Sequence, residues 1–321
     1  AIEFSGFITD VQQSSLYVEL VTRGSVVATS ESEGLDLKIP DAGATMHAEA
    51  TQLWNAQTQF WIEHFRTTLA SGETEYCANY LKQKYVENIL WNAVIEADLD
   101  SRRHRFSDEQ RLNAQALRAD GLREIIAPPL AGFMVATLSS FTSAQFVLLN
   151  IARNLTELEH LMHDLRLESA GRNQSVEPAA VLLPLDVGEH PSVTHALEQA
   201  VRFDDVFGVP AESASSGADV FAQLLMGHSS IGPCWERVDS LELLISLFAN
   251  LVEGEQLAHL LLMRSWISWF KGESSLASAA MLQAQEASLA GGVPLEILLE
   301  RSIIPEWVSH SDQCYKSRKL G

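Results

Sequence analysis

Apolar residues recur three and four positions apart along most of this chain, the spacing of an amphipathic helix whose apolar stripe faces a core. On the first such stretch the expected inward stripe holds Met46, Leu53, Phe60 and Trp61. The pattern predicts helices over about residues 44–70, 75–100, 107–128, 129–138, 143–168, 218–226, 240–271, 274–290 and 294–304. We therefore expect a mainly α protein in which many helices pack in an orthogonal or bundle-like domain.

The first forty residues follow a different pattern. Residues 16–21 and 25–29 are strand-like and flank Arg23-Gly24, which indicates a β-hairpin. Apolar and polar residues alternate again over residues 35–39, where a third strand would end at Pro40. Because a two- or three-stranded unit is too small to be stable alone, we expect it to dock on the helices or on a neighbouring subunit.

This change of pattern divides the chain into an N-terminal β segment, residues 1–42, and a helical domain, residues 43–321. Four prolines interrupt residues 170–217, where the helical domain can be subdivided. A short helix is expected to begin at Pro191, because the fixed φ of proline suits the first helical position.

One segment is apolar enough to require a membrane test. No Asp, Glu, Lys or Arg occurs from Pro128 to Ala152, a length that could span a bilayer. Its middle is rich in Ser and Thr, and Thr142 with Gln145 forms a capping-box pattern that begins a new helix. We expect two short buried helices and no membrane span.

The charge balance narrows the choice of partners. Hydrophobic residues make up 46% of the chain and charged residues 20%, which is typical of a globular protein. Its 42 acidic and 22 basic residues give a formal net charge of -20. Such a surface repels polyphosphate, so we expect no binding of duplex nucleic acid over most of it.

The three cysteines, Cys77, Cys234 and Cys314, lie far apart in the sequence and form no CxxC pair or zinc-binding spacing. We interpret them as reduced thiols, with Cys77 and Cys234 as small core residues. No signal-peptide pattern is visible at the N-terminus, so we expect a cytoplasmic or otherwise intracellular protein that is not secreted.

The sequence contains no complete motif of a common enzyme class. No Gly-rich phosphate loop follows a strand, and residues 227–232 place their second glycine one position too late for a serine-hydrolase elbow. The pair Glu157 and His160 has the spacing of a di-iron ligand motif. On a helical wheel, however, both residues point away from the apolar stripe of Ile151 and Leu158, so we assign them to a solvated face.

Two other acid and histidine positions lie within or beside apolar stripes. If Gly254 does not break the helix, Glu255 and His259 lie four residues apart within its apolar stripe. A buried carboxylate there would need the imidazole as a partner. Such a pair can simply fix core packing. If His64 and Glu96 converged on it, the four residues would suit iron, manganese or zinc. Otherwise we expect no cofactor.

Two of the seven tryptophans lie outside the predicted helices. Trp235 follows Pro233-Cys234, and Trp307 follows Pro305 near the C-terminus. We consider both as candidates for a partner surface, with burial at a loop anchor as the alternative.

The sequence therefore favours a non-enzymatic structural or assembly protein, such as a self-associating shell subunit of the viral-capsid type, with itself or another protein as partner. Two alternatives stay open: a helical-bundle metalloenzyme that uses the His64, Glu96, Glu255 and His259 set, and an acidic helical adaptor that binds one protein partner.

Overall fold

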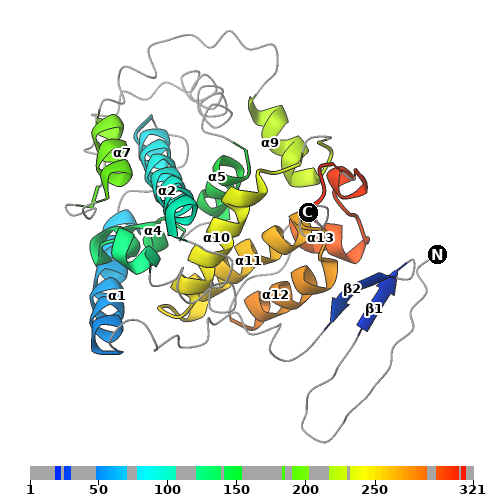
Figure 1. The fold of residues 1–321 in the computed structure, drawn as a ribbon, viewed down its shortest axis with the longest axis horizontal. Helices are drawn as coiled ribbons and strands as arrows, with labels where there is room; N and C mark the ends of the chain where they lie inside the picture. The colour runs from blue at the N-terminus through cyan, green and yellow to red at the C-terminus, as the bar shows by residue number, and fades with distance from the viewer. Residues whose placement is uncertain are drawn as a thin grey trace, which may run out of the picture.

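The computed structural model describes residues 19–22, 25–29, 48–70, 78–105, 121–138, 141–153, 183–184, 190–201, 217–229, 232–287, 294–310 and 312–315. This part of the chain is mainly helical, as Figure 1 shows. The mainly α prediction is therefore confirmed.

The helices follow one another in an order close to the predicted one. They are α1 (Ala48–Ala70), α2 (Ala78–Arg105), α4 (Pro128–Thr137), α5 (Phe141–Ala152), α7 (Pro191–Val201), α9 (Gly217–Met226), α10 (Trp235–Ala249), α11 (Gly254–Phe270), α12 (Ser274–Glu286), α13 (Pro294–Glu300) and the 3₁₀ helix η3 (Glu306–Ser309). Pro191 is the first residue of α7, as its fixed φ predicts.

The uncharged segment from Pro128 to Ala152 forms the two predicted short helices, α4 and α5, which are largely buried. Two prolines begin α4, where their missing amide protons leave no hydrogen bond unmade. Among the described residues, no helix combines the length and the apolar character that crossing a bilayer requires.

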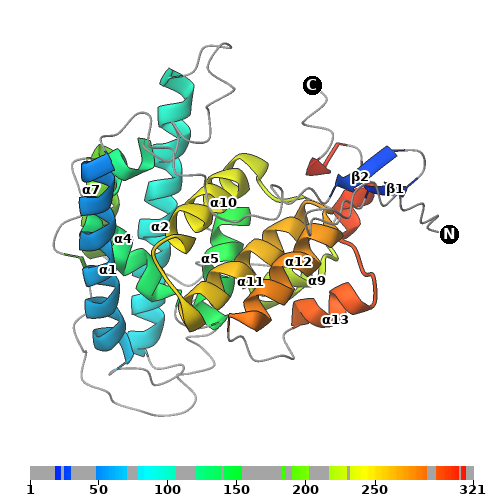
Figure 2. The same ribbon diagram turned by 90° about the horizontal axis from the view of Figure 1, so that it is seen from below.

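The helices pack around α5, which lies in the middle of the molecule (Figures 1 and 2). On one side α1 packs on α4, while α10, α11 and α12 lie side by side on the other. Most tryptophans fill the core: Trp91, Trp266, Trp269 and Trp307 are at most 2% exposed, and Trp54 is 7% exposed.

The predicted single helix over residues 240–271 is wrong, because the structure divides it into α10 and α11. Gly254 begins α11 with a φ of +59°, a left-handed conformation that side-chain-bearing residues rarely adopt. The turn before it lets α11 run back beside α10 and bury its own apolar stripe.

At the N-terminus β1 (Glu19–Thr22) pairs antiparallel with β2 (Ser25–Thr29), with Thr22 opposite Ser25. The third strand expected over residues 35–39 lies outside the described residues, as do Glu157, His160 and most of the helix expected over residues 107–128. The docking of the β segment and the division into domains stay predictions.

Candidate functional site

The outer face of α1 carries apolar side chains in contact with water. Leu53 is 60% exposed and Phe60 is 65% exposed. The buried face of α1 is instead formed by Trp54, Ile62 and Phe65. The prediction that Leu53 and Phe60 face inward was therefore wrong. α4 packs on a different face of α1.

No charged residue occurs on α1 between Glu49 and Glu63, although the chain carries a net charge of -20. The first charges beyond this stretch are Glu63 and Arg66, which pair at 2.9 Å on the exposed surface. A hydrogen bond from Arg66 holds the pKa of the Glu63 carboxyl below its usual value. Depletion of charge with enrichment of aromatic residues is typical of the core of a protein–protein interface.

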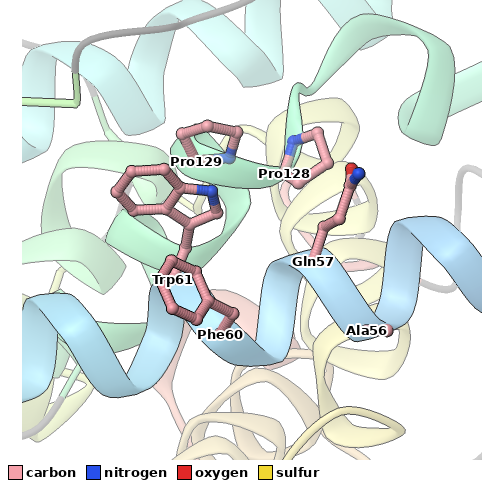
Figure 3. A pocket seen from close by; sticks show the side chains of 6 residues that line it. All are labelled: Ala56, Gln57, Phe60, Trp61, Pro128 and Pro129. Atoms are coloured by element: carbon pink, nitrogen blue, oxygen red, sulfur yellow. The ribbon is translucent and has the colours of Figure 1, made fainter.

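A pocket lies between α1 and the start of α4 (Figure 3). The side chains of Gln57 and Trp61 project from α1 toward the two prolines that begin α4. We call this depression the α1/α4 pocket, and its lining residues are Ala56, Gln57, Phe60, Trp61, Pro128 and Pro129. Apart from the Gln57 amide, its lining side chains are apolar or aromatic, so it is suited to an apolar side chain of a partner.

Aromatic contacts connect the pocket with the core. The ring of Phe60 meets Trp61 edge-on at 5.4 Å, and Trp61 stacks on Phe65 at 5.5 Å between centroids. Phe65 then meets Phe133 of α4 edge-on at 5.4 Å. Because each ring restricts the next, exposed Phe60 and partly buried Trp61 are held in position before any partner binds.

Other large apolar side chains are exposed outside α1. Leu282 of α12 is 60% exposed, Ile297 of α13 is 45% exposed, and Ile304, just after α13, is 52% exposed. Met226, the last residue of α9, is 40% exposed. In both ribbon views α1 lies at one end of the molecule and α13 lies toward the other (Figures 1 and 2).

The sequence did not single out these exposed residues. Exposed Ile and Leu side chains occur singly on many protein surfaces and have no distinctive sequence pattern. The one signal available in advance for the exposed face of α1 was the uncharged stretch between Glu49 and Glu63.

The four candidate metal ligands are placed differently from one another. His64 is exposed on α1, where its ring meets Trp61 edge-on at 5.3 Å, and Glu255 is exposed in the first turn of α11. Their expected inward orientation was wrong. Glu96 forms an ion pair with Arg237, whereas His259 is only 9% exposed.

Among the residues that the structure describes, no three His, Cys, Asp or Glu side chains are grouped as ligands of a metal ion. The predicted use of iron, manganese or zinc by these residues stays a prediction.

Arg237 of α10 is the polar residue that sequence reasoning missed. It is 9% exposed, and its guanidinium donates to Glu96 and Asn92 of α2 and, at 3.1 Å, to the carbonyl of Ile151 on α5. One side chain therefore joins three helices. A charge-assisted network of this kind fixes their relative positions rather than offering a reactive group.

The partner-surface prediction for Trp307 was wrong. This residue is fully buried, its indole nitrogen donates to the carbonyl of Phe270 at 2.9 Å, and its ring meets that of Phe270 edge-on. The expected alternative, burial at a loop anchor, is what the structure shows.

Trp235 is half-buried against the chain's own C-terminal residues. Its indole nitrogen donates to the carbonyl of Gln313 at 2.9 Å, and its ring meets Tyr315 edge-on at 5.3 Å. Cys234, expected in the core, is exposed because it is the N-cap of α10 at the molecular surface. Cys77 lies outside the described residues.

The buried imidazole of His259 makes the stability of the fold depend on pH. Burial lowers the pKa of its imidazole from 6.5, against the opposing effects of Glu255 and of a backbone hydrogen bond at Leu138. As the pH falls through 6.5, the unfolded chain takes up a proton at this ring before the folded chain does, so stability must decline.

We expect the free energy of unfolding to fall less steeply below pH 6.5 in His259→Gln than in the wild type, as measured by urea denaturation at several pH values. His195→Gln, on the exposed side of α7, is the matched control. Identical slopes for the wild type and His259→Gln would contradict the assignment.

Comparison with known proteins adds no functional assignment: no protein-family model, curated protein or solved structure matches this chain.

Proposed function

We propose that this protein is a non-enzymatic assembly subunit, a helical scaffold that works by binding other protein surfaces and first of all copies of itself. A self-associating shell of the viral-capsid type is the form of assembly that we favour. The observation that carries the proposal is the exposed apolar face of α1 beside the α1/α4 pocket.

Exposure at this face is costly unless a partner covers it. Phe60 and Leu53 together place two large apolar side chains in water on one side of α1, two helical turns apart. Contiguous apolar surface that includes aromatic residues and lacks charge is characteristic of sites that bind other proteins. Burial in an interface removes this area from water and stabilises the complex.

The overall acidity of the chain is consistent with the same function. A net charge of -20 keeps separate copies apart over most of their surface. Contact is then favoured only where charge is missing, as it is on α1 between Glu49 and Glu63. Association of this kind depends on ionic strength, because salt screens the repulsion between the remaining surfaces.

The mass of the native particle tests the proposal. We expect light scattering on the full chain to give a mass that is a multiple of 35.4 kDa and that rises with protein concentration and with salt. Electron microscopy of the same sample should show discrete particles. A strict monomer at high concentration and high salt would overturn self-association and leave the adaptor alternative.

A further inference from the structure

An exposed aliphatic side chain and an apolar pocket lie on the same face of α1. Leu53 is 60% exposed and lies two helical turns before Phe60, which is 65% exposed. Phe60 lines the α1/α4 pocket, as do Gln57 and Trp61 of the same helix. A pocket with aromatic walls is the kind of site that takes an aliphatic side chain. One surface of this protein therefore offers both halves of a contact.

The spacing of the two halves suits a second copy of α1 that runs in the opposite direction. Leu53 and Phe60 are seven residues apart, the repeat at which two packed helices insert side chains between those of the other. If Leu53 of each antiparallel copy lies opposite Phe60 of the other, a two-fold axis passes between Ala56 and Gln57, which are both exposed. Each Leu53 then reaches the α1/α4 pocket of the other copy.

The distribution of charge on α1 favours the same register. No charged residue occurs between Glu49 and Glu63, and the middle of this stretch is Ala56, beside the same axis. The register that joins Leu53 to Phe60 therefore lays uncharged surface on uncharged surface. Contacts between other surfaces of two copies are opposed on average by the net charge of -20.

The two ends of the uncharged stretch differ in charge, and this difference selects the direction of packing. One end carries Glu49. At the other end Arg66 pairs with Glu63 at 2.9 Å and is also attracted by Glu255 of α11, and exposed His64 lies beside them. A parallel contact would place Glu49 beside Glu49 of the second copy, whereas an antiparallel contact places it beside the end with mixed charges. Because like charges opposite one another weaken a contact, the antiparallel direction is favoured.

We infer that α1 of one copy packs antiparallel on α1 of a second copy, with Leu53 of each copy in the α1/α4 pocket of the other. This inference rests on the proposed function and names the surface and the register that carry it. In both ribbon views α1 lies at one end of the molecule, where a second copy can approach it (Figures 1 and 2). Because both copies use the same surface, the contact closes a two-fold dimer, and a larger assembly would add further contacts to it.

Substitutions of opposite charge at the two positions test the contact. Leu53→Lys and Phe60→Glu each place a charge against an apolar side chain of the second copy. Each should raise the dissociation constant of the dimer roughly thirtyfold or more, as the loss of an interface hot spot does. Both positions are exposed, and circular dichroism with thermal unfolding checks that the helices are retained. Ala222→Lys and Ala222→Glu, on the exposed surface of α9, are the matched controls and should dimerise as the wild type does.

Mixing the two variants identifies the register. In a heterodimer of Leu53→Lys with Phe60→Glu, one Leu53 meets one Phe60 as in the wild type, and the introduced lysine meets the introduced glutamate. Native mass spectrometry of an equimolar mixture should therefore show more heterodimer than either homodimer. The double variant should dimerise again, because it forms two pairs of opposite charge. In a parallel contact position 53 faces position 53, so neither rescue would occur.

Three results would contradict the antiparallel contact, and they differ in their consequence for the proposed function. A wild type that stays monomeric overturns both. If the wild type associates and either single variant associates equally well, the contact lies elsewhere on the molecule, so the α1 contact is overturned while self-association stands. If both single variants weaken association but neither the mixture nor the double variant restores it, α1 does not pair in this register and the inference is overturned.

Discussion

Lys271→Ala is expected to lower the free energy of unfolding by about 3 kcal/mol, the low end of the range for breaking a buried ion pair. Lys271 is 3% exposed at the end of α11. Its ammonium lies 2.8 Å from an oxygen of Asp239 and 2.6 Å from one of Glu242. It also lies 4.2 Å from the centre of the Tyr315 ring. Removing it leaves two neighbouring carboxylates without their shared cation.

We expect a loss of unfolding free energy at the low end of this range because neither Asp239 nor Glu242 is fully buried. The side chains of Asp239 and Glu242 are 22% and 21% exposed, and Glu242 keeps a second partner, Arg264, at 3.0 Å. Denaturation by urea measures the effect. Arg66→Ala, which breaks the exposed pair with Glu63, is the control and should lower the free energy of unfolding far less, because solvent screens an exposed ion pair. Equal losses in the two variants would contradict the prediction.

Lys271 also makes the stability of the fold depend on pH in the alkaline range. Burial acts to lower the pKa of Lys271, but the negative charges of Glu242 and Asp239 outweigh it and raise the pKa above the ordinary 10.5. The stabilisation is therefore complete below about pH 10.5 and is lost as the pH rises further. Lys271→Ala should lack this part of the alkaline decline.

Gly132→Ala is expected to destabilise the fold by about 2–3 kcal/mol, as overpacking of a tight core does. Gly132 lies inside α4 where this helix crosses α1. A Cβ atom added there would lie 2.4 Å from the Cβ of Trp61 and 2.8 Å from the backbone nitrogen of Ile62. Because a backbone cannot rotate away as a side chain can, the two helices would have to separate.

The sign of this effect makes the test decisive. Helix propensity alone predicts that replacing glycine by alanine within a helix stabilises it by about 1 kcal/mol. Ala222→Gly on exposed α9 measures that propensity effect in this protein. Thermal unfolding of both variants is the measurement. Stabilisation by Gly132→Ala would show that α1 and α4 do not approach as closely as the structure has them.

The local signals in the sequence accounted for most of the helices. The charge-free segment after Pro128 divided into α4 and α5 as its Ser- and Thr-rich middle indicated, and Pro191 began α7. Propensity, capping and the special geometry of proline act over a few residues, so they can be recognised without knowing what the helix packs against. The sequence left open whether the chain breaks at Gly254, because a single glycine inside a long apolar pattern also occurs within continuous helices.

The candidate site could not be predicted in the same way. Two apolar faces of α1 have a helical spacing, one with Leu53 and Phe60 and the other with Trp54 and Phe65. A helical wheel shows both faces but not which of them another helix covers. The close approach of α4 at Gly132 decides it. His64, expected inside, is exposed for the same reason.

The amino-acid sequence by itself determined that the chain is acidic, because net charge depends on composition. It also determined that the chain is mainly helical and where most helices begin, because these properties depend on near neighbours. Only the tertiary structure decided which apolar face of α1 stays in water and which helices Arg237 joins. The partners of Arg237 come from α2 and α5, far away in the sequence. Such contacts exist only after the helices have packed, so no local pattern records them.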